Sequence, residues 1–195
     1  MKTLVLLLTL FFLSLPAWAR STTQSSELRQ ELQKLSQKNA SLKDATLQIQ
    51  KRYGTKAYLP LLQIAKDHKK SSDEERTLAF LAAVRVGGTS AESEIIHFLS
   101  DSSWMLRMAA IKVALALQLP KARQALLGRL EDRALVIRSA VAHALTRIYV
   151  PNSTPALKKA LQTRSNYHKG KPLPIIQTLQ KALAAQAVPT LEVRD

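Results

Sequence analysis

The side chains best suited to chemistry in this 195-residue chain are four histidines and fourteen carboxylates, and neither group shows the spacing of an active site. His68, His97, His143 and His168 lack the H-E-x-x-H pattern, which places two imidazoles and a carboxylate together around zinc. There is no G-x-S-x-G turn to expose a nucleophilic serine, and the chain contains no cysteine. We therefore predict a protein that is not an enzyme, with no metal site and no cofactor.

A different pattern appears in the arginines. Arg76, Arg107 and Arg138 are spaced 31 residues apart, and Asp101 and Asp132 each precede an arginine by six residues. A constant period of this length indicates an internal repeat, in which each unit is one supersecondary element. The repeat must therefore be understood before any role is given to these charged residues.

The apolar residues that follow each arginine predict amphipathic helices. Leu78, Ala79, Ala82, Ala83 and Val86 are separated by one, three, one and three residues, which forms a stripe along one side of a helix. The same spacing recurs twice, in Ala109, Ala110, Val113, Ala114 and Leu117, and in Ala140, Val141, Ala144, Leu145 and Ile148. A shorter apolar segment follows each stripe, so the predicted unit is helix, turn, helix.

Turn residues divide the chain in agreement with this unit. Gly87-Gly88, Pro120 and Pro151 each follow a long helix, as helix terminators do. Asp101-Ser102-Ser103 and Asp132 are candidate N-caps for the helices that come next. The low glycine content and the abundant Ala and Leu also favour an all-α protein.

The segment Asp101-x-x-Trp104-x-Leu106-Arg107-x-Ala109-Ala110-x-x-x-Ala114-Leu115 and its echo from Asp132 to Leu145 resemble HEAT repeats. They are most similar to the short variety of roughly 30 residues that is also found in phycobilin lyase-like proteins. The resemblance covers about residues 57 to 186. It departs from the pattern at Lys70 and Lys169, where an Asp and an Arg would fall, and at an insertion from Asn166 to Lys171.

This resemblance implies a short right-handed α-solenoid of stacked antiparallel helix pairs. It also implies a structural ladder, in which each arginine binds a carboxylate or a backbone carbonyl of the adjoining turn. The alternative, a catalytic Asp–Arg pair in a cleft, is less favoured. The ladder residues are Arg76, Asp101, Arg107, Asp132 and Arg138.

The first nineteen residues predict a secretory signal peptide. Lys2 precedes an apolar run from Thr3 to Leu15, and Ala17-Trp18-Ala19 has the small residues of a cleavage site. The run is shorter than the ~20 residues that span a bilayer, and no later segment is apolar enough to do so. We therefore expect an exported protein, periplasmic or secreted, with no transmembrane segment after cleavage.

Between the signal peptide and the repeats lies a polar segment, residues 20–52, which predicts a long helix. Leu28, Leu32, Leu35, Leu42 and Ile49 follow a heptad that is interrupted by polar residues. The segment either packs on the first repeat, stays flexible, or forms a weak coiled coil that joins two copies through residues 20–50. The repeat domain then covers residues 53–186, and residues 187–195 form a C-terminal tail.

The formal net charge of +15 predicts attraction to anionic partners but does not identify them. Repeat scaffolds usually bind proteins or peptides on a concave face lined by their second helices, so another protein or peptide is the expected partner. An anionic polymer or surface, such as nucleic acid, acidic cell-wall glycan or phospholipid headgroups, is the alternative. The candidate binding residues lie on or beside those helices: Lys121, Arg123, Lys158, Lys159 and Arg164.

Overall fold

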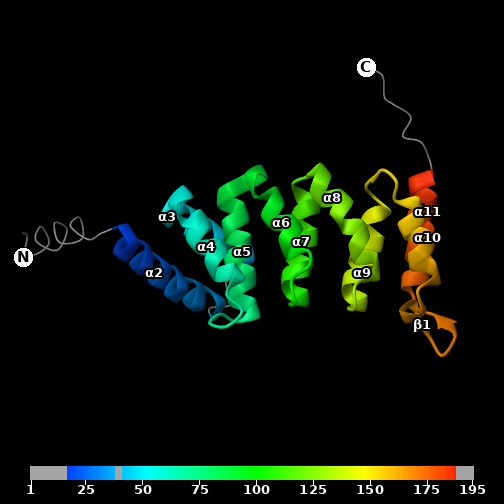
Figure 1. Cartoon of the computed structure of the whole chain (residues 1–195), viewed down its shortest axis with the longest axis horizontal. Helices are drawn as coiled ribbons and strands as arrows, with labels where there is room; N and C mark the ends of the chain where they lie inside the picture. Colours follow the sequence, from blue (N-terminus) through cyan, green and yellow to red (C-terminus); the bar gives the residue numbers. More distant parts are fainter. Residues whose placement is uncertain (1–16, 38–40, 188–195) are drawn as a thin grey trace, which may run out of the picture. The chain divides into compact units, whose positions relative to one another are not determined.

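The computed structural model describes residues 17–37 and 41–187, and it is mostly helical (Figure 1). The predicted signal peptide lies outside the described residues except for Ala17 to Ala19, which begin the first described helix. The predicted C-terminal tail lies outside them except for Ala187. No helix of the described part has the length and apolar character needed to cross a membrane. The chain divides into two compact units, with the boundary after Gly88.

Unit 1 contains α2 (Ala17–Gln37), α3 (Leu42–Tyr53), the 3-10 helix η1 (Gly54–Ala57), α4 (Tyr58–Lys66) and α5 (Asp73–Gly87). α4 and α5 form a closely packed pair, α2 packs on both, and α3 packs on α5. The single long helix expected in the polar segment is therefore divided into two. The second begins where the Ser41 hydroxyl accepts a hydrogen bond from the Asp44 N–H, which is an N-cap.

The predicted heptad residues are used inside unit 1. Leu28, Leu32, Leu35 and Ile49 are buried, because α2 and α3 turn these side chains toward α4 and α5. Leu42 remains 55% exposed. Among the possibilities for this segment, packing on the first repeat helices is the one observed. A dimer formed through residues 20–50 would have to use other side chains.

The end of α5 shows why the sequence has two consecutive glycines there. Gly88 follows the last residue of α5 with φ 56° and ψ −134°, a positive-φ conformation that glycine adopts without strain. Gly87 lies against Tyr58, and a Cβ atom at this position would lie 2.5 Å from the ring carbon Cε2. The first glycine is thus required by packing and the second by the backbone.

Unit 2 continues from the 3-10 turn η2 (Gly88–Ala91), which crosses the unit boundary. It contains α6 (Glu92–Phe98), α7 (Trp104–Ala116), α8 (Pro120–Leu126), η3 (Leu127–Glu131), α9 (Leu135–Leu145) and α10 (Thr154–Gln162). It ends with η4 (Arg164–Asn166), a hairpin of β1 (Tyr167–His168) and β2 (Lys171–Pro172), and α11 (Ile175–Ala187).

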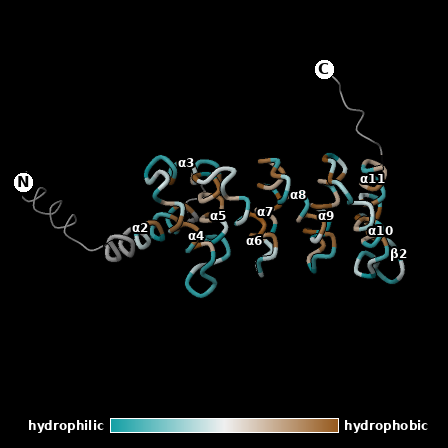
Figure 2. The backbone as a smooth tube through the Cα atoms, turned by 45° about the horizontal axis from the view of Figure 1, so that its top comes forward, coloured by the Kyte–Doolittle hydropathy of each residue, from teal (hydrophilic) through white to brown (hydrophobic). Residues whose placement is uncertain are grey.

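The helices of unit 2 are stacked in two layers. The first helices of successive repeats pack on one another, α7 on α9 and α9 on α11, and the second helix α6 packs on α8. α5, α7 and α9 begin at Asp73, Trp104 and Leu135, so their starts keep the 31-residue period of the arginines. Figure 2 shows hydrophobic residues concentrated within the helices and hydrophilic residues at many of the turns. The predicted all-α architecture, with helices packed against one another, is thus confirmed.

The predicted N-caps need a correction. Asp101 and Asp132 do not cap α7 and α9, which begin after Ser103 and Ala134. Each carboxylate instead accepts a hydrogen bond from the N–H two residues ahead, at 2.8 Å from Ser103 and 2.9 Å from Ala134. This geometry is an Asx turn, which shapes the chain just before the helix.

The segment after α10 departs from the repeat as the insertion predicted. Its hairpin pairs His168 with Lys171, and the two-residue loop has positive φ angles, 49° at Lys169 and 76° at Gly170. Further on, Gln186 of α11 is buried and donates to the carbonyls of Leu145 and Ile148 at 2.8 and 2.6 Å. It thereby satisfies backbone groups that the end of α9 leaves without intrahelical partners.

Candidate functional site: an arginine ladder and its cleft

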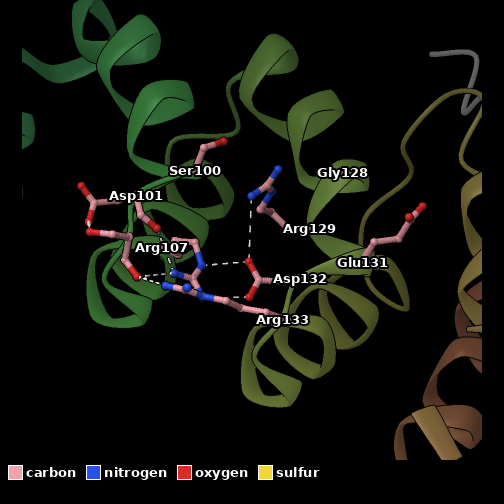
Figure 3. Close-up of a pocket in the computed structure, with 9 residues that line it drawn as sticks. Ser100, Asp101, Arg107, Gly128, Arg129, Glu131, Asp132 and Arg133 are labelled. Atoms are coloured by element: carbon pink, nitrogen blue, oxygen red, sulfur yellow. Dashed lines mark hydrogen bonds and ion pairs between the residues drawn. The ribbon is translucent and has the colours of Figure 1, made fainter. Parts of the chain in front are cut away.

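Arg107 forms the centre of the ladder in unit 2. Its Nη2 donates to Asp132 Oδ1 at 2.8 Å, and its Nε lies 2.8 Å from Asp132 Oδ2 as an ionic contact without a second hydrogen bond. Its Nη1 donates to the carbonyls of Asp101 and Ser102 at 2.8 and 2.9 Å. The side chains of Arg107 and Asp132 are each only 3% exposed. Arg107 therefore joins the turn before its own helix to the turn of the next repeat (Figure 3).

Arg138 makes the next step of the ladder with a different acceptor. Its Nη1 donates to the Asp132 carbonyl at 2.8 Å, and its Nε donates to Asn166 Oδ1 at 2.8 Å. Its Nη2 donates to the Ser165 carbonyl at 2.9 Å. Burial lowers the pKa of Arg138, and the charge of Asp132 offsets part of this effect. A neutral amide thus takes the place that an aspartate holds one repeat earlier.

Asn166 was not identified from the sequence, where it appeared only as the first residue of an insertion. It is fully buried, and its side chain also donates to the Ala160 carbonyl at 2.8 Å. The insertion shifts it away from the 31-residue register, so periodicity alone does not point to it. The available signal was its position three residues before a Lys-Gly turn, which is where a hairpin must be anchored.

In unit 1, Arg76 is buried and donates from Nε to the Ala65 carbonyl at 2.9 Å and from Nη1 to Asp73 Oδ1 at 3.2 Å. Lys70, which replaces the expected aspartate, contributes its backbone N–H to Asp67 Oδ1 at 3.1 Å. Asp67 therefore does what Asp101 and Asp132 do in the following turns. Asp67 does not stand out in the sequence, because it lies three residues earlier than the repeat spacing requires.

Asp67 is also bound to α2, where Arg29 Nη2 donates to its Oδ2 at 2.7 Å. Burial disfavours the Asp67 carboxylate, but the hydrogen bonds from Arg29 and from the N–H groups of Lys70 and Lys69 outweigh it and lower its pKa. Glu75 lies 4.0 Å from the same guanidinium, and burial raises the pKa of Glu75 despite that charge. Two carboxylates beside one arginine thus have pKa values shifted in opposite directions.

A cleft of about 370 Å³ opens beside Arg107 (Figure 3). Two further arginines line it: Arg129 Nη1 lies 3.9 Å from Asp132 Oδ2, and Arg133 Nη2 donates to the Ser102 carbonyl. Glu131 also lines the cleft, and its carboxylate is paired with Lys159 at 2.7 Å. Three cations and three carboxylates line the cleft, so it has no net formal charge: Arg107, Arg129, Arg133, Asp101, Glu131 and Asp132.

The ladder's polar groups are mostly occupied by one another and by backbone carbonyls. This is the arrangement of a structural network, because the Arg107 guanidinium already donates to the Asp132 carboxylate and to two backbone carbonyls. The described residues contain no group of three His, Asp or Glu side chains placed to hold a metal ion.

The predicted binding residues are spread along the second helices. Lys121 and Arg123 belong to α8, and Arg123 donates to Gln118 Oε1 at 3.2 Å. Lys158 and Lys159 are exposed on α10, and Arg164 is exposed on η4. Of the five, Lys159 alone has an ion pair assigned in the described part of unit 2, and that pair links it to the rim of the cleft.

The comparison with known families supports the repeat. Residues 58–146 match the family model for HEAT repeats, a range that includes α4 to α9. No curated protein matches the chain. The family match, the 31-residue spacing of the helix starts and the layered packing of unit 2 agree with one another. Together they show that residues 58–146 carry HEAT repeats.

Proposed function

We propose that this chain is an exported, non-enzymatic HEAT-repeat protein that acts as a scaffold and binds another protein or peptide. HEAT repeats commonly serve as protein-interaction scaffolds, because stacked helix pairs present an extended surface to a partner. The short period supports repeats of the phycobilin lyase-like type, stacked as a right-handed solenoid. Fold similarity to such proteins carries no activity with it.

The observation that carries this proposal is a contrast in unit 2 between buried arginines, which bind neighbouring turns, and exposed apolar side chains. The ladder arginines Arg107 and Arg138 are buried and bind carboxylates, amides and carbonyls of neighbouring turns. Large apolar side chains, in contrast, are left exposed at equivalent starts of two repeats, with Trp104 51% and Leu135 39% exposed. Exposed apolar side chains with charged neighbours are typical of protein interaction surfaces.

We propose the face formed by the second helices as the contact surface. In stacked repeats this face is the concave one. Of the side chains singled out from the sequence, Lys121, Arg123, Lys158 and Lys159 belong to the second helices α8 and α10, whereas Arg164 follows α10 on η4. Their charge would speed association with an acidic partner, and the effect would weaken as salt is added.

A capture experiment tests the scaffold proposal. The tagged chain is expressed in its native host, cross-linked in the exported fraction, and its partner is then purified and titrated by calorimetry. We expect one protein partner to bind with defined stoichiometry and to remain bound at roughly 0.5 M salt, where surface charge attraction is screened. Failure of every purified candidate to bind would refute the scaffold.

Binding of an anionic polymer is the second candidate, and one observation favours it. Residues 133–187 contain nine Lys and Arg residues and no Asp or Glu. Such a run raises the local concentration of any polyanion. A nucleic acid, acidic glycan or anionic vesicle that binds tightly at low salt, and loses affinity steeply as salt rises, would support this candidate over the first.

Export has its own test. Mass spectrometry of the protein recovered outside the cytoplasm should give a mature chain that begins at Arg20, since Ala17-Trp18-Ala19 supplies the small residues that the peptidase requires. A chain that keeps Met1 would contradict it.

A further inference from the structure

We propose that the turn end of unit 2 is a docking site for a protein segment that is rich in both acidic and apolar side chains. The turn end consists of the chain before α7 with Trp104, the chain before α9 with Leu135 and Val136, and the segment from η4 through the hairpin. Its exposed side chains are Trp104, Arg133, Leu135, Arg164, Lys169 and Lys171. This inference rests on the proposed scaffold function and gives it a different surface from the second helices.

The ladder holds these three segments side by side. Arg107 binds the carbonyls of Asp101 and Ser102 on one side and the Asp132 carboxylate on the other. Arg138 then joins the Asp132 carbonyl to the Asn166 side chain at the base of the hairpin. Because these contacts are buried, the turn end is pre-organised, and a ligand does not have to order it on binding.

The apolar part of the turn end follows from the repeat. Trp104 and Leu135 are the first residues of α7 and α9, so they occupy equivalent positions one repeat apart. Val136, beside Leu135, is 48% exposed. The inward stripe of each helix is supplied by other residues, such as Leu106 and Ile137, which are fully buried. These exposed apolar side chains do not contribute to the core, and they can contact apolar side chains of a partner.

The cationic part comes mainly from the inserted hairpin. Insertions within a repeat form loops on one face, which is often the binding face. Both central residues of its loop have positive φ, as in the type I′ turn that favours Asn-Gly, yet the first is Lys169. A residue other than glycine is uncommon at positive φ, and the side chains of Lys169 and Lys171 are both exposed. The Tyr167 hydroxyl fixes the hairpin to α10 by donating to the Leu161 carbonyl at 2.8 Å.

The chemistry of the surface favours a peptide over a nucleic acid or a lipid surface. Trp104 and Tyr167 are exposed and have planar faces, but Leu135 and Val136, which continue the apolar row, offer no face on which a base can stack. The cleft between the turns is lined by Asp101, Glu131 and Asp132 as well as by arginines, and these carboxylates would oppose a uniformly anionic polymer or bilayer. A peptide can place apolar side chains near Trp104 and Leu135 while its carboxylates meet Arg133 and the hairpin lysines.

Peptide selection followed by fluorescence titration tests this inference. Phage-displayed peptides of about 12 residues, long enough to cross two turns, are selected on the immobilised full chain. Selected peptides are then synthesised and titrated into the full chain carrying Trp18→Phe, in which Trp104 is the single tryptophan and reports the turn end directly. We expect selected sequences to combine Asp or Glu with apolar residues, and their binding to shift the emission of Trp104.

Two charge-matched variants locate the site. The turn-end variant carries Arg164→Gln, Lys169→Asn and Lys171→Thr, where Asn and Thr suit the loop and the strand. The control carries Lys121→Gln, Arg123→Gln and Lys158→Gln on the second helices and loses the same formal charge. We expect the turn-end variant to weaken peptide binding about tenfold or more, and the control to change it about twofold or less. Circular dichroism melts verify that both variants fold.

Several outcomes would overturn the inference: no selected peptide, peptides without acidic residues, or equal losses in the two variants. Anionic vesicles of phosphatidylglycerol or a single-stranded oligonucleotide that shift Trp104 emission more strongly than the peptides would also overturn it. The captured protein partner separates this inference from the scaffold proposal. If the partner binds the turn-end variant as tightly as wild type but loses the control variant, the scaffold stands and the turn end does not.

Discussion

Replacing Arg107 by methionine tests whether the ladder holds unit 2 together. Met has a similar length but no donors, so the change leaves the Asp132 carboxylate buried, with the Ala134 N–H at 2.9 Å and Arg129 at 3.9 Å as its remaining partners. Removing one member of a buried ion pair costs about 3–5 kcal/mol. Because Arg129 offsets part of the unpaired charge of the buried Asp132 carboxylate, we expect a loss of about 3 kcal/mol in the free energy of unfolding.

Urea denaturation followed by far-UV circular dichroism and Trp104 fluorescence measures this loss. Lys112→Met is the matched control, because Lys112 lies on the same helix and is exposed, so it should change the free energy by less than about 0.5 kcal/mol. The double variant Arg107→Met with Asp132→Asn removes both charges and keeps an acceptor for the Ala134 N–H. It should therefore be more stable than Arg107→Met alone.

The reasoning is refuted if Arg107→Met unfolds at the same urea concentration as the Lys112→Met control. It is also refuted if the effects of Arg107→Met and Asp132→Asn simply add, because two residues in direct contact must then have no coupling. Unchanged stability combined with lost partner binding would instead assign Arg107 to recognition.

Four further variants probe the residues that the structure added. Asn166→Ala should lower the free energy of unfolding by about 2–3 kcal/mol, because Arg138 loses a buried acceptor, whereas Ser165→Ala should have little effect; equal urea midpoints for the two would contradict this. Gln186→Leu should cost about 2 kcal/mol in the same assay, because the Leu145 and Ile148 carbonyls lose their buried donor, and an unchanged melt would show that water replaces it. For the pair beside Arg29, urea midpoints from pH 3 to 7 should show opposite trends. The raised pKa of Glu75 gives a contribution that is present in acid and lost as pH rises through that pKa, so Glu75→Gln becomes relatively more stable toward neutral pH. The lowered pKa of Asp67 gives a contribution that is present near neutrality and lost as pH falls, so the defect of Asp67→Asn should disappear in acid; parallel trends would show that one of the two signs is wrong.

The repeat was predictable from sequence because each unit repeats the same local requirement. An apolar stripe at helical spacing must be buried, and a 31-residue period places the next stripe against it. The helix starts at Asp73, Trp104 and Leu135 keep that period. The buried arginines also stood out, since an arginine recurring on the edge of an apolar stripe needs a partner close to its own turn.

The acceptors of the ladder were harder to predict. Asp132 and backbone carbonyls of the adjoining turns were expected as acceptors, but the amide of Asn166 was not. Any hydrogen-bond acceptor at the correct place can bind a guanidinium. The type of the accepting residue is therefore weakly constrained, whereas its position in space is strongly constrained. An insertion shifts the accepting residue along the sequence without shifting it in space, so the 31-residue period does not identify it.

Residue types and their spacing by themselves determined the helices, their order, the repeat length and the strong positive charge, because these depend on local periodicity and composition. Tertiary packing alone decided that Leu28 and Leu32 cover α4 and α5, that Asp67 and not residue 70 shapes its turn, and that Trp104, Leu135 and the hairpin lysines share one end of unit 2. The physical reason is that burial and hydrogen bonding are properties of neighbours in space. Those neighbours lie many residues apart along the chain, and they meet only after the helices have stacked.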